Sequence, residues 1–134
     1  MNLDQTSDNL IKQIQMNLTD DVLSPKYRKI LRKTPLEGHC YVAAEALYHL
    51  MGGSAAKLTA FVASYEEDGQ KFTHWWLRNS RGNILDPTAS QYLDIGQEPP
   101  YSKGKAIGFL TKAPSARAQI VINKVNKALG GAQT

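Results

Sequence analysis

Three residues near the middle of the chain have side chains that together could perform nucleophilic catalysis: Cys40, His74 and Asp86. A cysteine thiolate attacks carbonyl carbons, an imidazole carries the proton, and a carboxylate orients the imidazole. Where such groups meet in space, they form the cysteine version of the Ser-His-Asp triad. Whether they meet depends on the elements that position them.

Cys40 follows Gly38 and His39 and directly precedes the most apolar helix expected in the chain, residues 41–51. A helix that is apolar on nearly all sides is buried. A thiol at its N-terminus lies at the positive end of the helix dipole, beside unpaired backbone N–H groups. Both favour the thiolate, and the same N–H groups could hold an oxyanion. The simpler interpretation of a lone cysteine is a small buried apolar residue.

His74 and Asp86 are expected on neighbouring antiparallel strands, residues 71–78 and 83–86. If the connecting loop has three residues, paired positions sum to an even number and both side chains point to the same face. Gly82 suits such a loop, because a three-residue hairpin commonly ends on a left-handed glycine. A loop of two or four residues would place them on opposite faces. The competing interpretations are a core histidine and a carboxylate that ends a strand.

The other two histidines are less suited to act as the base. His39 points away from its neighbour if the segment is extended. His49 lies four residues after Glu45 and is expected to be a surface or boundary residue paired with it. A zinc site made from His39 and the three triad candidates would have suitable ligand types. We expect no metal, because an adjacent His-Cys pair rarely directs both side chains at one ion.

The motifs around these residues resemble the transglutaminase-like family, part of the broader papain-like cysteine protease group. They match the family's G-x-C-x-x-x-A, H-x-W and D-P-T patterns, in that order, over about residues 36–90. The matching segments are Gly38-His39-Cys40-Tyr41-Val42-Ala43-Ala44, His74-Trp75-Trp76 and Asp86-Pro87-Thr88.

The resemblance implies an enzyme that acts on an amide carbonyl of a protein or peptide through a thioester, without a cofactor. It implies Cys40 as the nucleophile, His74 as the general base and then acid, and Asp86 as the residue that orients His74. The family includes peptidases, amidases, protein deamidases and glutamine-to-amine transferases. We expect hydrolysis, as a peptidase or deamidase, over transfer, because hydrolysis needs no second substrate pocket in so short a chain.

Two aromatic residues near the motifs are candidates for contact with the substrate. Trp76 shares the face of His74 by strand alternation, and Tyr41 directly follows the nucleophile. Packing in the core is the competing interpretation for both. The upstream residues that could complete an oxyanion hole are Gln13, Gln15 and Tyr27.

The expected order of elements is that of one α+β domain, residues 1–134: helices, an antiparallel meander and a C-terminal helix. The nucleophile lies at the N-terminus of the buried helix, which packs on the meander. Beside the helix and strands given above, we expect helices over 5–17, 25–33 and from Ser115 to Gly130, strands over 58–65 and 106–110, and a loop over 89–104.

Composition limits the class of protein. The chain has 134 residues, 42% of them hydrophobic, a net charge of +4 and a single cysteine. One cysteine excludes an intrachain disulfide and suits a reducing compartment. The first residues lack a signal-peptide pattern, and no apolar run reaches the ~18 residues of a transmembrane helix. We therefore expect a cytoplasmic protein that does not enter a membrane.

A basic cluster supports an alternative function. It lies in the expected helix 25–33 and consists of Lys26, Arg28, Lys29, Arg32 and Lys33. A catalytically inactive binding or inhibitory module of the same fold could use it to contact an acidic protein or a nucleic acid. A solvated helix face is the simpler interpretation, and few aromatic residues accompany the cluster, so we do not expect nucleic-acid binding.

Overall fold

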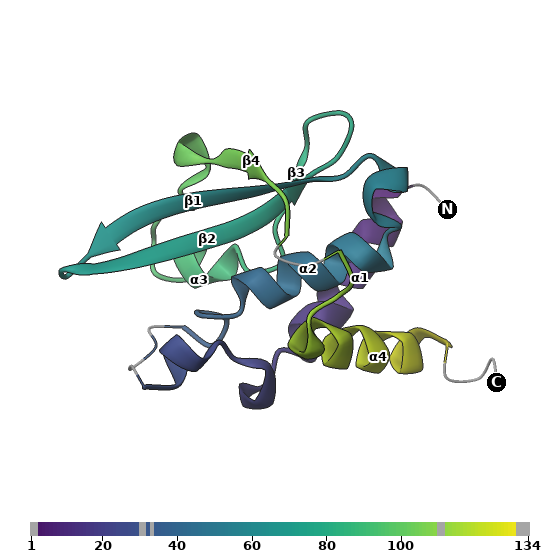
Figure 1. Cartoon of the computed structure of the whole chain (residues 1–134), viewed down its shortest axis with the longest axis horizontal. Helices are drawn as coiled ribbons and strands as arrows, with labels where there is room; N and C mark the ends of the chain where they lie inside the picture. Colours follow the sequence, from purple (N-terminus) through teal and green to yellow (C-terminus); the bar gives the residue numbers. More distant parts are fainter. Residues whose placement is uncertain (1–2, 30–31, 33, 110–111, 131–134) are drawn as a thin grey trace.

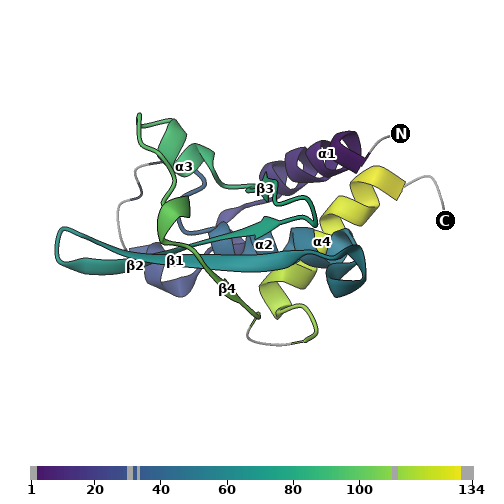
Figure 2. The same cartoon turned by 90° about the horizontal axis from the view of Figure 1, so that it is seen from above.

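The computed structural model describes residues 3–29, 32, 34–109 and 112–130. Within these ranges the chain has an α+β fold, with helices packed against a four-stranded antiparallel sheet (Figures 1 and 2). The α-helices are α1 (Leu3–Met16), α2 (Cys40–Leu50), α3 (Ser90–Leu93) and α4 (Ala116–Gly130). The strands are β1 (Thr59–Glu67), β2 (Gln70–Arg78), β3 (Ile84–Leu85) and β4 (Lys105–Ile107). Short 3-10 helices are η1 (Asp20–Val22), η2 (Pro25–Lys29), η3 (Gly53–Ala56) and η4 (Tyr101–Lys103).

The sheet has the strand order β3-β2-β1-β4, so the predicted meander is present and β4 is added at its β1 edge. β1 and β2 form a long hairpin in which Thr59 pairs with Arg78 and Glu67 with Gln70. Its turn residues, Asp68 and Gly69, both have positive φ, 53° and 78°. This is the conformation that a tight two-residue hairpin turn requires, and it sets the register of β2.

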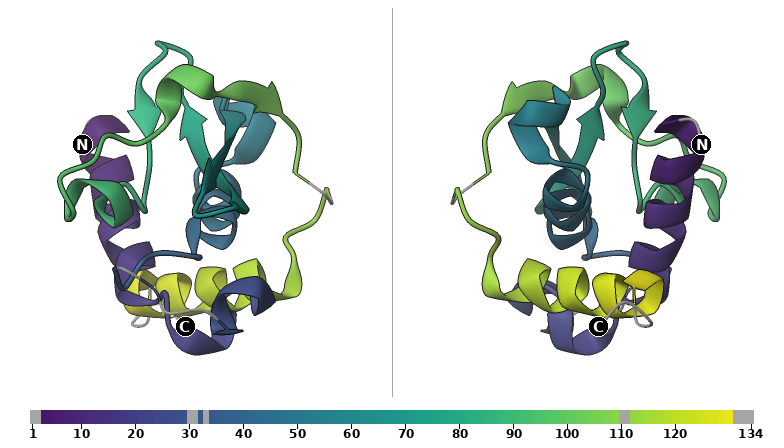
Figure 3. Two further views of the ribbon diagram at one scale, coloured as in Figure 1. Left: turned by 90° about the vertical axis from the view of Figure 1, so that its left-hand side faces the viewer. Right: turned by 90° about the vertical axis from the view of Figure 1, so that its right-hand side faces the viewer.

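α2 lies at the centre of the molecule, between the sheet, α1 and α4 (Figure 3). Leu47 on α2, Leu77 on β2 and Val121 on α4 are fully buried in one core cluster. Burying a side chain of this size contributes roughly 1.5–3 kcal/mol. The helix that begins at the candidate nucleophile is therefore held along its length by the core.

One carboxylate lies inside this core and fixes the start of α4. Glu45 is fully buried and accepts hydrogen bonds from the backbone N–H of Ser115 at 2.9 Å and from its hydroxyl at 2.7 Å. A buried carboxylate is costly unless it is satisfied in this way. The expectation of a surface pair between Glu45 and His49 is therefore wrong, because the carboxylate faces Ser115.

Two predicted segments differ from the structure. In place of the expected helix over 25–33, the structure has the short 3-10 helix η2, which ends at Lys29. Residues 30, 31 and 33 lie outside the described residues. Three cations of the basic cluster are used within the molecule. Lys26 Nζ lies 4.7 Å from the Phe72 ring centroid, Arg28 donates to the Asp21 carbonyl at 3.1 Å, and Arg32 pairs with Asp20 at 3.0 Å. The expected loop over 89–104 contains α3 and η4.

The last predicted strand is found as β4, which ends at Ile107; Leu110 lies outside the described residues. None of the helices in the described ranges combines the length and apolar character needed to cross a bilayer.

Candidate active site

Cys40 is the first residue of α2, as expected, and 6% of it is exposed. The first backbone N–H groups of a helix have no partner within the helix, and they carry the positive end of the dipole. The thiol lies against β2, where Sγ donates to the Thr73 carbonyl oxygen at 3.5 Å. The sulfur is thereby held against β2, at the residue that precedes His74.

His74 and Asp86 meet because the loop between β2 and β3 has the predicted length. The Asn79 N–H donates to the Asn83 carbonyl at 3.0 Å, which leaves three residues in the loop, and Gly82 has φ +81°. The two side chains therefore lie on one face. His74 Nε2 and Asp86 Oδ2 are 2.6 Å apart, and their side chains are 0% and 3% exposed. This pair confirms the predicted geometry.

Each oxygen of the Asp86 carboxylate accepts a hydrogen bond from a group other than His74. Oδ1 accepts from the Thr88 backbone N–H at 3.1 Å, while Oδ2 accepts from the Tyr101 hydroxyl at 2.8 Å as well as facing His74. Hydrogen bonds to an ionised carboxylate are stronger than those between neutral groups. The carboxylate is thus fixed in one orientation toward His74.

Aromatic rings enclose the His74 imidazole. Trp76 is stacked on it with centroids 5.5 Å apart, and Tyr92 of α3 meets it edge-on at 4.8 Å. The Tyr92 hydroxyl donates to the Tyr65 hydroxyl at 2.8 Å. The imidazole is therefore fully buried, and its rotation is restricted on both faces.

The charge state of His74 follows from a competition between burial and its two polar neighbours. Burial lowers the pKa of His74, but the contacts with Asp86 and Cys40 outweigh it and raise the pKa from 6.5 to about 9. At neutral pH the imidazolium form is therefore favoured. Because Nε2 faces Asp86, the other nitrogen, Nδ1, remains to exchange a proton with Cys40, and it is buried with no hydrogen-bond partner among the described residues.

His39 has the opposite environment although it directly precedes Cys40. It is 1% exposed, and its Nε2 lies 3.5 Å from an Arg32 guanidinium nitrogen. Burial, and then the charge of Arg32, lower its pKa to about 4. A neutral imidazole beside a guanidinium is suited to packing, and the structure brings His74, not His39, to Asp86.

The proposed donors for an oxyanion hole have different positions. Gln15 donates from Nε2 to the Pro87 carbonyl at 2.9 Å, so it ties α1 to the β3 segment. Tyr27 packs on Gly38, where an added Cβ would come within 2.5 Å of its ring. Burial, followed by the charge of Cys40, raises the pKa of Tyr27, which places it within electrostatic range of the sulfur. Tyr27 is thus better placed than Gln15 to donate a hydrogen bond near the Cys40 sulfur.

Neither predicted substrate contact is a freely accessible side chain. Trp76 is fully buried and contacts His74 rather than solvent. Tyr41 is half-buried, and its ring meets Trp75 edge-on at 4.7 Å. Their contact with a substrate stays a prediction.

Sequence reasoning missed Thr88 and Tyr101 as hydrogen-bond partners of Asp86, and it missed that the Tyr92 ring packs beside the site while its hydroxyl binds Tyr65. The Thr88 contact could have been found, because an Asp side chain commonly accepts from the backbone N–H two residues later. Tyr92 and Tyr101 could not, because they lie in a segment whose proline and glycine content predicts a loop. The sequence carries no signal for which way that loop folds.

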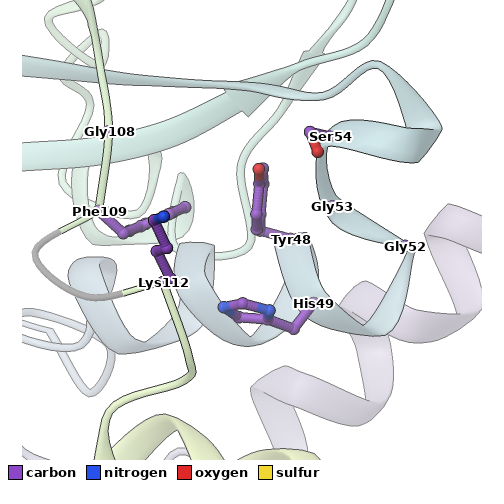
Figure 4. A pocket seen from close by; sticks show the side chains of 8 residues that line it. All are labelled: Tyr48, His49, Gly52, Gly53, Ser54, Gly108, Phe109 and Lys112. Carbon is purple, nitrogen blue, oxygen red and sulfur yellow. The ribbon is translucent and has the colours of Figure 1, made fainter.

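A pocket lies beside the C-terminal half of α2, and Cys40, His74 and Asp86 are not among the residues that line it (Figure 4). Its lining includes Tyr48, His49, Phe109 and Lys112. His49 therefore lines this pocket and does not face Asp86. Within the described residues, no three His, Cys, Asp or Glu side chains are gathered as they would be around a metal ion.

The chain was compared with protein-family models, with curated proteins and with solved structures, and none of them matches it significantly.

Proposed function

We propose that the protein is a thiol-dependent hydrolase or acyl transferase that acts on an amide of a protein or peptide. Hydrolysis, as a peptidase or deamidase, is the favoured form. A catalytic thiol in a chain with one cysteine suits a reducing compartment, so we propose the cytoplasm as its location.

One observation carries the proposal: His74 lies between Asp86, at 2.6 Å from Nε2, and the thiol at the start of α2. A buried histidine that only fills space does not need a carboxylate on one side and a cysteine on the other. Strongly shifted pKa values caused by such specific partners are typical of catalytic groups. The motif resemblance to transglutaminase-like enzymes names the same three residues.

The reaction follows from these positions. Cys40 gives its proton to His74, and the thiolate attacks the amide carbonyl carbon to form a C–S bond and an oxyanion. The C–N bond then breaks, His74 returns the proton to the leaving amine, and a thioester remains. Water, with His74 as base, attacks the thioester and releases a carboxylic acid and the Cys40 thiol.

The backbone N–H groups at the start of α2 donate hydrogen bonds to the oxyanion, and the Tyr27 hydroxyl is the side-chain donor. Loss of a single donor of this kind typically lowers the rate ~10²–10³-fold. A second amine in place of water would give transfer instead of hydrolysis.

The first test is the rate of Cys40 alkylation by iodoacetamide as a function of pH. Because the chain has one cysteine, labelling reports on Cys40 alone. We expect half-maximal reactivity well below the ~8.5 of a free thiol, and a shift upward in His74→Ala. His49→Ala is the matched control, because it removes a histidine from α2, the helix that Cys40 begins, and leaves Cys40, His74 and Asp86 unchanged. Cys40→Ala should not label at all.

A wild-type profile equal to that of a cysteine peptide, or a thiol that reacts only on unfolding, would refute the proposal. The alternative of an inactive binding module would then gain support. Its test is salt-sensitive binding of an acidic polypeptide that is lost when Lys29 and Arg32 are changed to Gln.

A further inference from the structure

We infer that Tyr101 is a positioning residue for the proposed reaction, which holds Asp86 Oδ2 against His74 Nε2 and acts on Cys40 only through these two residues. The inference rests on the proposed function, but its test can fail separately.

The Asp86 carboxylate has little freedom because each oxygen has its own protein donor. Thr88 binds Oδ1 from the backbone, whereas Tyr101 binds Oδ2, the oxygen that faces His74. Without the Tyr101 hydroxyl, Oδ1 would remain fixed, while only His74 would hold Oδ2. The carboxylate could then rotate about the Thr88 contact and leave the imidazole.

Tyr101 is itself fixed by the backbone that carries it. It begins η4, and Gly104 at the end of this turn lies directly on Trp76, where an added Cβ would be 2.4 Å from the indole. β4 follows at once and pairs with β1, with Ala106 opposite Phe61. The chain is thus attached to the sheet within a few residues of Tyr101.

The Tyr101 ring contacts the same group of side chains. It meets Trp76 edge-on at 5.1 Å and lies 6.3 Å from the His74 ring centroid. Because Trp76 is stacked on His74, Tyr101, Trp76, His74 and Asp86 form one closed cluster. The Tyr101 hydroxyl therefore binds Asp86 from within this cluster and not as an isolated surface group.

The structure offers a matched control in Tyr92. It lies in the same covering segment, it contacts the His74 ring, and its hydroxyl also makes one 2.8 Å hydrogen bond. That bond goes to Tyr65 and not to the triad. Tyr92→Phe and Tyr101→Phe therefore remove the same atom from similar surroundings, but only one of them touches Asp86.

The test is the pH profile of iodoacetamide labelling of Cys40 in the full chain. We expect Tyr101→Phe to lower the rate at pH 7 about tenfold and to move the midpoint upward, because a loosened carboxylate stabilises the imidazolium less well. Tyr92→Phe should stay within about twofold of wild type. In an Asp86→Asn background, Tyr101→Phe should have no further effect, because the two residues act in series.

Three results would overturn the inference: a wild-type profile in Tyr101→Phe, an equal loss in Tyr92→Phe, or additive losses in the double variant. If wild type itself labels like a free cysteine peptide, the proposed function fails and this inference with it. Should Tyr101→Phe not fold, the proton NMR spectrum of wild type replaces it. We expect a slowly exchanging Tyr101 hydroxyl proton that is lost in Asp86→Asn, and its absence in wild type counts against the inference.

Discussion

His39 and His74 differ in charge although they are almost equally buried, at 1% and 0% exposure. His39 faces Arg32, and its pKa is lowered to about 4. His74 lies between Asp86 and Cys40, and its pKa is raised to about 9. Burial alone lowers the pKa of both, so the sign of the neighbouring charge decides the difference.

This difference separates packing from chemistry. A histidine that stays neutral near pH 7 can fill space next to the nucleophile without competing for its proton. A histidine kept as imidazolium can stabilise a thiolate and later protonate a leaving amine. The comparison therefore favours His74, 34 positions from Cys40, over its direct neighbour His39 as the base in the proposed reaction.

The largest expected effect comes from replacing each histidine in turn. His74→Gln should lower turnover of any true substrate by about 10²–10⁴-fold, because it removes the proton carrier. It should lower the rate of Cys40 alkylation at pH 7 by about 30-fold, because a thiol with a pKa of ~8.5 is only ~3% thiolate at that pH. His39→Gln should change both by only a few-fold. The measurement is the rate of Cys40 labelling in each variant, after circular dichroism has verified that the variant is folded. Equal losses in the two variants would remove the functional distinction between the two sites.

The second prediction concerns the pH dependence of the free energy of unfolding. His74 has a pKa that is higher in the folded state, so its contribution is full below about 6.5 and is lost as pH rises toward 9. His39 has a lowered pKa, so its contribution is full above 6.5 and is lost as pH falls toward 4. Each loss should be on the order of 3 kcal/mol.

Urea denaturation from pH 4 to 9.5 tests this in wild type and the two Gln variants. His74→Gln should flatten the alkaline side of the curve and His39→Gln the acid side. The reverse assignment, or curves that keep both slopes, would show that other groups cause the pH dependence.

A third comparison concerns the glycines near each histidine. Gly38, one residue before His39, has φ +90°, and an added Cβ would come within 2.5 Å of Tyr27; Gly104 meets Trp76 at 2.4 Å. Gly38→Ala combines backbone strain with overpacking and should cost about 2–4 kcal/mol. Gly104→Ala involves overpacking alone and should cost about 1–3 kcal/mol. Thermal unfolding of both variants measures which substitution destabilises the protein more. A larger loss of stability in Gly104→Ala would contradict the strain assigned to Gly38.

The smallest expected effect is that of Arg32→Met. Since burial lowers the pKa of His39 more than Arg32 does, this change should raise the pKa only partway from about 4 toward 6.5. The pKa of His74 should not move. NMR titration of the imidazole protons tests both statements, and a full return of His39 to 6.5 would mean that Arg32 and not burial controls it.

Much of the site could be predicted from local patterns in the sequence. The apolar residues 41–51 required a buried helix, so Cys40 had to lie at its start. A three-residue loop ending at Gly82 placed His74 and Asp86 on one face. These predictions depend on side-chain period and turn geometry, which act over a few residues and are therefore visible in the chain itself.

Contacts between distant segments were decided by the tertiary structure. Tyr101 and Tyr92 reach the triad from a segment predicted as loop, and Glu45 turns inward to Ser115, 70 positions away. The charge of each histidine also depends on groups brought close only by folding. Hydrophobic periodicity specifies which face of an element is buried, but it does not specify which polar group from elsewhere meets it there. The sequence alone determined where Cys40, His74 and Asp86 lie on their elements, and the packing of distant segments decided how they are held and charged.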